Sequence, residues 1–355
     1  MLKQYNIVVL RGDGIGPEIV AEAVKVLDAA GEKFGFRFAY DEQLMGGCAI
    51  DATGEPLPQQ TVEACKKADS VLLGAVGGWK WDTLPGSQRP EAGLLGIRSA
   101  LGLYANLRPA KIFEPLKSAS PIKDSIIGDQ LDILVVRELT GGIYFGRPQG
   151  RDEGGDRAVD TCTYSRQEIE RVLHVAFRLA MSRRRHLTVV DKANVLETSR
   201  FWREIAQQLA PQYPEVELDF MFVDNAAMQI IRQPTHFDVI VTENMFGDIL
   251  TDEASVISGS LGMLPSASVG SEVALFEPIH GSYPQAAGKN IANPMAAILS
   301  AAMLLEHLGL TAEGSAVRDA VNRALTEGIV TEDLAAQGER RYSTSEVGDF
   351  IAAHI

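Results

Sequence analysis

The sequence predicts an α/β fold in which helices cover a mixed β-sheet. Over the first hundred residues, short apolar runs that are typical of buried parallel strands alternate with segments of helical periodicity. Between residues 104 and 164 the apolar runs follow one another with only loops between them, which indicates an antiparallel or mixed arrangement. From residue 187 onward, strands and helical segments alternate again. We therefore expect a sheet with both parallel and antiparallel neighbours.

The expected elements begin with a strand at Tyr5–Leu10 and a helix at Pro17–Glu32, which carries proline in its first turn. Ser165 and Glu168 form a capping box, which predicts a helix that runs to about Arg185. The apolar segment Met295–Leu305 is expected to be a buried helix, because it is too short to span a bilayer. The further expected strands are Phe36–Tyr40, Val71–Val76, Tyr104–Phe113, Leu131–Glu138, Gly142–Pro148, Ala158–Tyr164, Leu187–Val190, Val216–Val223 and Phe237–Thr242.

Neither an internal repeat nor a linker rich in Pro and Ser divides the chain. We therefore expect two interleaved domains. One is formed by residues 1–103 and 259–355 and holds both termini, and the other is formed by residues 104–258.

Composition excludes several classes of protein. The 355 residues carry a formal net charge of -14, which argues against nucleic acid as a partner, because phosphate binding needs clustered Lys and Arg. The basic run Arg183–His186 is interpreted as the cation-rich end of the preceding helix, which the helix dipole favours. The three cysteines match no disulfide or zinc pattern, and the first residues show no signal-peptide pattern. We expect a cytoplasmic protein that does not enter a membrane.

Three arginines, Arg98, Arg108 and Arg137, are candidate anion-binding residues. Arg137 ends a very apolar strand, where a charge is unfavourable unless it is paired. A guanidinium is a planar fork suited to bidentate binding of a carboxylate. Taken singly, each arginine is better explained by a salt bridge with one of the many acidic residues.

Asp248 and Asp252 are candidate metal ligands. In a helix, a spacing of four places both carboxylates on one face with Cβ atoms roughly 5–6 Å apart, where they repel each other unless a cation lies between them. Such oxygen donors suit Mg²⁺ or Mn²⁺. Asp224 is a third acid, at the end of a predicted strand, where the ligand sites of open sheets collect. Two solvated acids near a helix start are the alternative.

Lys192 and Tyr144 are candidates for proton transfer. Lys192 follows the strand Leu187–Val190, and a desolvated lysine can serve as a base. Tyr144 lies in a glycine-rich segment and could donate a proton, although a single tyrosine is more often a half-buried core residue.

The sequence contains no Rossmann dinucleotide motif. The glycines of residues 12–16 open a helix after a strand, but the motif requires its third glycine where this chain has Pro17. A better candidate for a nucleotide site is the glycine-containing loop from Glu277 to Pro294, which leads into the apolar helix and can offer backbone groups.

In their order along one chain, these features resemble the isocitrate/isopropylmalate dehydrogenase family of metal-dependent β-decarboxylating dehydrogenases. The resemblance covers nearly the whole chain, from Gly12–Glu18 to Asn293 and Pro294. It implies the fold of that family, with a cofactor-binding domain that holds both termini and a second domain for substrate, metal and dimerisation. Within the family the chain looks most like the members that oxidise and decarboxylate 3-isopropylmalate to 4-methyl-2-oxopentanoate in leucine biosynthesis, with reduction of NAD.

The resemblance also implies a role for each candidate in a homodimer with shared active sites. The three arginines would bind the carboxylates of the small-molecule substrate. Asp248 and Asp252, with the partner subunit's Asp224, would hold Mg²⁺ or Mn²⁺. The partner subunit's Lys192 would take the hydroxyl proton, and Tyr144 would protonate the enol that is left after CO₂ departs.

Contacts to the alkyl group of the substrate are implied for Glu91, Leu94, Leu95 and Val195, which match the pattern for an isopropyl group. Burial of such a group stabilises a complex by about 1.5–3 kcal/mol. The third carboxylate of isocitrate would find no partner on this apolar wall. The alternative for Leu94 and Leu95 is ordinary core packing.

The implied NAD-binding residues are His280, Gly281, Ser282, Gln285 and Asn293. NAD-linked members place Asp five residues after the loop histidine, where this chain has Gln285. NADP-linked members place Lys and Tyr at this position and the next, where this chain has Gln and Ala. Because no cation meets a 2′-phosphate, we expect NAD, with Gln285 bonding a ribose hydroxyl.

Two rival functions are weighed against this one. A D-malate or tartrate dehydrogenase of the same family would share the arginines and the metal site but would need less apolar volume. A non-catalytic regulatory paralogue would have lost part of the metal and proton-transfer set, which is complete in this chain.

Overall fold

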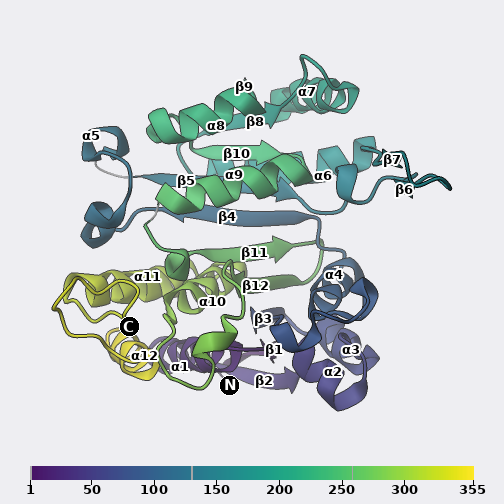
Figure 1. The fold of residues 1–355 in the computed structure, drawn as a ribbon. Helices are drawn as coiled ribbons and strands as arrows, with labels where there is room; N and C mark the ends of the chain where they lie inside the picture. The colour runs from purple at the N-terminus through teal and green to yellow at the C-terminus, as the bar shows by residue number, and fades with distance from the viewer. Residues whose placement is uncertain (1, 129–130, 258) are drawn as a thin grey trace. The chain divides into compact units, whose positions relative to one another are not determined.

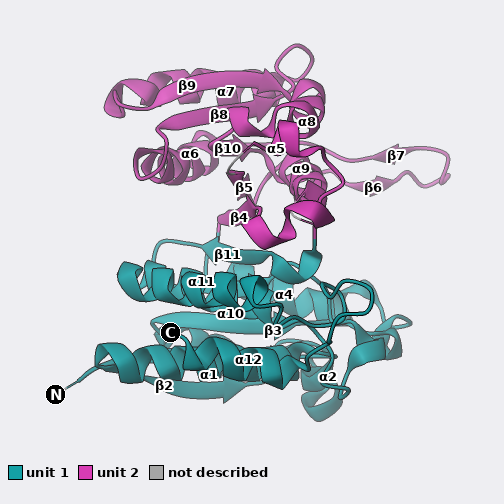
Figure 2. Cartoon of the chain, turned by 90° about the vertical axis from the view of Figure 1, so that its left-hand side faces the viewer, with its two compact units in different colours: residues 1–103, 260–355 teal, residues 104–259 magenta. Residues whose placement is uncertain are grey.

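The computed structural model describes residues 2–128, 131–257 and 259–355. The chain forms two compact units, which Figure 2 colours separately. Unit 1 comprises residues 1–103 and 260–355, and unit 2 comprises residues 104–259. The boundaries of the predicted domains fall within one residue of these limits.

Unit 1 is a mixed sheet with helices packed against it. Its strands lie in the order β2-β1-β3-β12-β11 (Figure 1); β11 and β12 are antiparallel, and the other neighbours are parallel. Strand β3 is buried at every position, as expected for a strand whose sheet is covered on both faces. The elements are β1 (Lys3–Gly12), α1 (Gly16–Phe34), β2 (Phe36–Gln43), α2 (Gly47–Thr53), α3 (Gln59–Lys67), β3 (Ser70–Ala75), α4 (Pro90–Ala100), β11 (Pro265–Val269), β12 (Ala274–Pro278), α10 (Met295–His307), α11 (Thr311–Thr326) and α12 (Thr344–Ala353).

Unit 2 is built in the same way around strands in the order β4-β5-β10-β8-β9. Strands β4 and β5 are antiparallel, and the other neighbours are parallel. Helix α9 packs on β4 and β5, α8 packs on β9, and α6 packs on β5, β10 and β8. The elements are β4 (Ala105–Lys111), α5 (Asp124–Ile127), β5 (Asp132–Glu138), β6 (Gly150–Arg151), β7 (Ala158–Val159), α6 (Arg166–Met181), β8 (His186–Asp191), α7 (Glu197–Leu209), β9 (Glu217–Phe222), α8 (Val223–Arg232), β10 (Val239–Thr242) and α9 (Asn244–Ile257).

The predicted fold class is confirmed, because each unit combines parallel and antiparallel strands with packed helices. The capping box of α6 is also present, since the Ser165 side chain accepts from the backbone N–H of Glu168, whose side chain accepts from the N–H of Ser165. Helix α10 is buried along most of its length, as predicted. None of the helices in the described part of the chain has both the length and the apolarity that a membrane span requires.

Two predicted strands, at residues 142–148 and 158–164, are wrong. The first segment instead begins with the 3-10 turn η4 (Gly142–Tyr144), in which Gly142 has a φ of 78°, a value that interrupts an extended run. Of the second segment, only the two residues of β7 form a strand, which pairs with β6.

Helix α6 ends at Met181 and not at about Arg185, so the basic run follows the helix. Arg183 donates to Asp132 and to Asp238, both at 2.8 Å. The run therefore serves mainly to pair acids at the beginning of neighbouring strands.

Candidate active site

Arg108 and Arg137 lie on neighbouring strands of unit 2, on the same face of the sheet. In the antiparallel pair β4–β5, Asn106 stands opposite Arg137. Arg108 is two residues further along β4, and side chains two apart on a strand share a face. Helix α9 packs over these strands. The two arginines are thereby brought under the helix that carries the predicted metal ligands.

The predicted helical spacing of Asp248 and Asp252 is confirmed, since both lie in α9. Arg137 donates from Nη1 to Oδ1 of Asp248. Nη1 of Arg108 lies 3.6 Å from Oδ1 of Asp252 and 4.0 Å from Oδ1 of Asp248. The two guanidiniums therefore offset the repulsion between the carboxylates. The Asp248 side chain is 39% exposed and that of Asp252 is 75% exposed, so both retain oxygens that are open to a ligand.

Each arginine is oriented by an asparagine that the sequence analysis missed. Nε and Nη2 of buried Arg137 donate to Oδ1 of Asn244 at 3.0 and 2.9 Å. Nε of Arg108 donates to Oδ1 of Asn106 at 2.7 Å, and its Nη1 donates to the Thr251 hydroxyl at 2.8 Å. A signal for Asn106 was present, because it precedes Arg108 by two residues in a predicted strand.

Close packing between α9 and β5 depends on Gly247. A Cβ atom at this position would lie 2.6 Å from Cγ of Arg137. The glycine therefore lets the Arg137 side chain pass beneath the helix and reach Asp248, the next residue in the chain.

Tyr144 joins this group from η4. Its hydroxyl donates to Oδ2 of Asp248 at 3.3 Å. Burial, together with the Asp248 carboxylate, raises the pKa of Tyr144, so the phenol keeps its proton at neutral pH. The turn is anchored by the fully buried Glu138, which accepts from the backbone N–H groups of Thr140 and Gly141 at 2.8 Å.

Lys192 and Asp224 form a separate pair within unit 2. Lys192 follows β8, as predicted, but Asp224 lies in the first turn of α8 and does not end a strand. Nζ of Lys192 donates to Oδ1 of Asp224 at 2.6 Å. This hydrogen bond lowers the pKa of the Asp224 carboxyl and keeps it ionised. The two residues pair with each other and not with the Asp248 group.

Four of the predicted substrate residues lie on one stripe of α4 in unit 1. Glu91, Leu94, Leu95 and Arg98 follow the spacing i, i+3, i+4, i+7, which defines one helix face. At the end of the stripe, Nη2 of Arg98 donates to Oε1 of Glu277 at 2.6 Å.

The apolar members of the predicted wall differ in burial. Leu94 packs against the buried cluster beneath α4, so core packing accounts for it. Leu95 is 54% exposed, and Val195 of unit 2 is 61% exposed. Core packing does not account for these two side chains, which are free to contact a ligand.

Unit 1 contains a cavity of about 360 Å³, which lies within the size range of small-molecule pockets. It is lined by Ile15, Gly262, His280, Gly281, Tyr283, Ile291, Ala292, Asn293 and Asp333. His280 donates from Nδ1 to the carbonyl of Gly281 at 3.0 Å, and its Nε2 is buried without a hydrogen-bond partner among the described residues. Burial lowers the pKa of His280. A neutral imidazole with a buried acceptor nitrogen fits a cavity that binds a polar ligand.

Of the five predicted cofactor residues, the cavity includes His280, Gly281 and Asn293. Ser282 instead accepts the N–H of Ile15 through its carbonyl at 2.8 Å, and Gln285 is exposed outside the lining. The acid on this cavity is Asp333, which the sequence analysis missed.

Asp333 accepts from Nδ2 of Asn293 at 3.1 Å and from the Thr331 hydroxyl at 2.5 Å. These bonds fix the carboxylate at the cavity wall. Asp333 comes 40 residues after Asn293 in the sequence, and no local pattern marks it as part of the site.

The sequence matches a family model and known proteins over nearly its whole length. The family model described as isocitrate/isopropylmalate dehydrogenase matches residues 6–351. A 3-isopropylmalate dehydrogenase of Clostridium acetobutylicum is 55% identical over 100% of both chains, and one of Geobacillus kaustophilus is 57% identical over 99% of this chain and 95% of its own.

Solved structures agree as well. An isocitrate dehydrogenase from Methylococcus capsulatus has 35% identity and a TM-score of 0.86 over 99% of each chain. A β-decarboxylating dehydrogenase from Thermococcus kodakarensis has 36% identity and a TM-score of 0.82 over 99% of this chain and 96% of its own. The chain belongs to the isocitrate/isopropylmalate dehydrogenase family.

Proposed function

We propose that the chain catalyses the NAD-dependent oxidative decarboxylation of 3-isopropylmalate to 4-methyl-2-oxopentanoate, a step of leucine biosynthesis in the cytoplasm. The observation that carries the proposal is the group formed by Arg108, Arg137, Asp248 and Asp252, which presents two guanidiniums and two carboxylates on one face of unit 2. The names of relatives with 55% and 57% identity over nearly the whole chain support the choice of substrate.

The donor set at α9 fits Mg²⁺ or Mn²⁺. Hard divalent cations prefer carboxylate oxygens and retain water, and Asp248 and Asp252 offer partly exposed carboxylates one helical turn apart. The partner subunit's Asp224 would complete the set. A cation bound there would withdraw electron density from the hydroxyl and carbonyl oxygens of the substrate.

The residues of the chain would supply binding and proton transfer. Arg108 and Arg137, oriented by their asparagines, bind the carboxylates of the malate moiety. The partner subunit's Lys192 takes the proton of the C2 hydroxyl, and Tyr144, which stays protonated beside Asp248, returns a proton to carbon after decarboxylation. Leu95 and Val195 provide exposed apolar surface for the isopropyl group.

A homodimer is part of the proposal. Helix α8 exposes Met228 and Ile231, three residues apart, and α9 exposes Ile249 and Val256, seven residues apart. Each spacing places its two side chains on one helix face. Large apolar side chains exposed in such stripes are typical of an interface. A second copy of the chain would cover them and bring its Lys192–Asp224 pair to the Asp248 group.

NAD is favoured over NADP by the cavity of unit 1. Its lining contains the Asp333 carboxylate and neither Lys nor Arg among the described residues. A 2′-phosphate would meet a negative charge there without a compensating cation.

The test is a comparison of kcat/KM for 3-isopropylmalate and D-malate, each with NAD and with NADP, in the presence of Mg²⁺. We expect NAD-dependent turnover with a preference of at least about 10-fold for 3-isopropylmalate, because an alkyl group of this size contributes about 1.5–3 kcal/mol. A preference for D-malate would replace the proposal by the D-malate or tartrate dehydrogenase alternative. No NADH production from either acid would favour a regulatory paralogue.

A further inference from the structure

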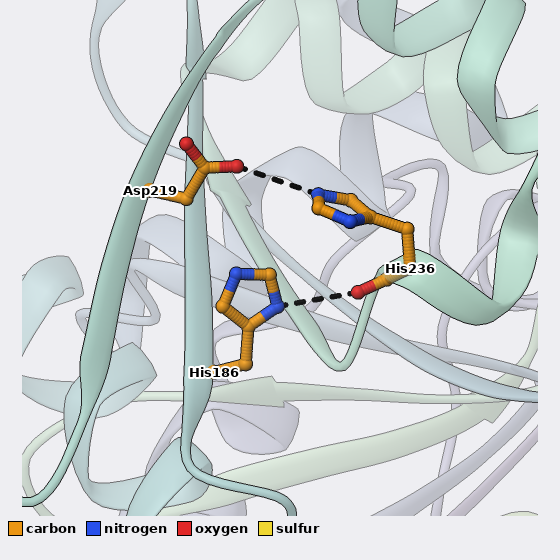
Figure 3. Close-up of side chains that lie close together, drawn as sticks. All are labelled: His186, Asp219 and His236. Atoms are coloured by element: carbon orange, nitrogen blue, oxygen red, sulfur yellow. Dashed lines mark hydrogen bonds and ion pairs between the residues drawn. The ribbon is translucent and has the colours of Figure 1, made fainter.

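Two histidines and an aspartate lie together at the amino-terminal edge of the parallel strands of unit 2, outside the residues of the proposed reaction. His186 is the first residue of β8, Asp219 lies in β9, and His236 ends the 3-10 turn η6 (Pro234–His236). One ligand atom from each residue lies within 4.8 Å of the others. Figure 3 shows both imidazole rings and the carboxylate directed toward one another. We propose that these three residues form a binding site for a transition-metal dication such as Zn²⁺.

One hydrogen bond orients the His186 ring for metal binding. Its Nδ1 lies 3.2 Å from the carbonyl oxygen of His236. A carbonyl can only accept, so this contact places the proton on Nδ1 and leaves the lone pair on Nε2. A ligating histidine in metal sites almost always donates its other N–H to a carbonyl or carboxylate in this way.

The spacing of the other two ligands also fits a metal. Nε2 of His236 lies 3.4 Å from Oδ2 of Asp219. Two ligands on a tetrahedral zinc with bonds of about 2.1 Å are themselves about 3.4 Å apart. None of the three side chains is fully buried, so small rotations can bring the remaining ligand atoms closer than 4.8 Å. Two imidazoles and one carboxylate, with water in the fourth position, are typical zinc ligands.

The three arginines before His186 do not form ion pairs with Asp219. They are paired with other acids: Arg183 with Asp132 and Asp238, Arg184 with Asp238, and Arg185 with Glu215. Oδ2 of Asp219 lies 3.4 Å from Nε2 of His236. A dication held by the two imidazoles would therefore lie beside the carboxylate of Asp219 and be attracted to it.

The cluster is distant from the residues of the proposed reaction. Strand β8 begins at His186, and Lys192 follows its last residue, Asp191. At about 3.3 Å per residue, six residues span roughly 20 Å. The cluster thus lies at the opposite end of the strand from Lys192, and its occupancy should leave basal turnover unchanged.

The experiment is calorimetric titration of the chelator-treated, dialysed full chain with Zn²⁺, in a large excess of Mg²⁺ that occupies the oxygen ligands at Asp248 and Asp252. Four proteins are compared: the unaltered chain, His186→Ala, His236→Ala and the control His354→Ala, which alters a histidine at the end of α12 in unit 1. We expect a site of one equivalent in the unaltered chain and in the control. Affinity should fall at least tenfold in His186→Ala and His236→Ala, with Mg²⁺-dependent turnover unchanged in all four.

Equal zinc affinity in all four proteins would overturn the proposal, because the ions would then bind elsewhere, for example at Cys48 or Cys162, which are partly exposed free thiols. Absence of binding to the unaltered chain would overturn it as well. If a histidine variant also loses turnover, Asp219→Asn replaces it. That change removes the anionic ligand with little change in shape, and unaltered zinc affinity in this variant would count against the site.

Discussion

Glu243 is a buried carboxyl whose ionisation should destabilise unit 2 as the pH rises toward neutrality. It lies between β10 and α9 and is only 5% exposed. Burial, reinforced by the carboxylates of Glu138 and Asp191, raises its pKa to about 7. The Cys162 thiol, at 4.0 Å from Oε2, is a weak donor that does little to stabilise the charge. We therefore expect the replacement Glu243→Gln to stabilise the protein at alkaline pH.

The magnitude follows from the pKa. A rise from the ordinary value of 4.5 to about 7 corresponds to roughly 3 kcal/mol, at 1.36 kcal/mol per pH unit. Because the folded-state pKa is raised, the stabilising contribution of Glu243 to the free energy of unfolding is fully present below pH 4.5. It is lost as the pH rises through about 7. The free energy of unfolding of Glu243→Gln should therefore exceed that of the unaltered chain by roughly 3 kcal/mol at pH 8, and the difference should narrow toward pH 5.

Urea denaturation at pH 5, 6, 7 and 8 measures this difference. The fluorescence of Trp202 reports on unit 2 when Trp79 and Trp81, which lie in unit 1, are replaced by Phe in every protein compared. The protein concentration is kept constant because the proposed dimer would contribute to stability. Glu272→Gln, at an exposed acid in unit 1, is the matched control and should follow the parent chain at every pH. A constant offset between Glu243→Gln and its parent across this range would refute the reasoning.

Two further predictions concern the proposed reaction. Asp248→Asn should lower kcat/KM by at least about 100-fold, because an amide is a weaker ligand for a hard cation and a weaker partner for Arg137. Circular dichroism should show that the fold is intact. Near-normal turnover of this variant in EDTA-treated buffer would contradict the metal role. Lys192→Met should lower kcat by about 10²–10⁴-fold, as expected for loss of a general base, while calorimetry still detects substrate binding. If the Lys192→Met variant instead lost dimerisation and kept its kcat, Lys192 would be a structural residue.

The sequence predicted those parts of the fold that depend on local periodicity. The apolar runs located β1, β2 and β3 of unit 1 and β4, β5, β8, β9 and β10 of unit 2, but β11 and β12 were not predicted. Ser165 with Glu168 located the start of α6. The errors arose where tertiary contacts decide the outcome. The backbone adopts a positive φ at Gly142, directly after Gly141 donates its N–H to buried Glu138, and no alternation of apolar residues encodes this. Arg183 follows a helix end but pairs with Asp132 and Asp238, which lie at or next to the start of β5 and β10 and far from Arg183 in the sequence.

In the site too, residues that follow a local pattern were predicted, and residues that depend on tertiary contacts were missed. Asp248 and Asp252 could be predicted from the sequence because residues four apart in a helix lie on the same face. Asn244 was missed because its function, to hold Arg137, requires knowledge that β5 and α9 are neighbours. Asp333 was missed because 40 residues separate it from Asn293. Conversely, the loop at residues 12–16 attracts attention as a nucleotide motif. In the structure, Asp13 accepts backbone N–H groups of Gly47, Cys48 and Gly77, so the loop joins chain segments of unit 1.

The charges of unit 2 explain how a chain with a net charge of -14 can bind a dianion. A guanidinium buried at the end of β5 requires a counter-charge, which Asp248 supplies. The group of Arg108, Arg137, Asp248 and Asp252 is then neutral, with two charges of each sign. A dication alone would leave this group at +2, and a malate dianion alone would leave it at -2, whereas both together keep it neutral. Each ligand therefore lowers the electrostatic cost of binding the other, and the coupling is reciprocal. Because the Lys192–Asp224 pair is itself neutral, its addition by the second subunit of the proposed dimer would preserve this balance.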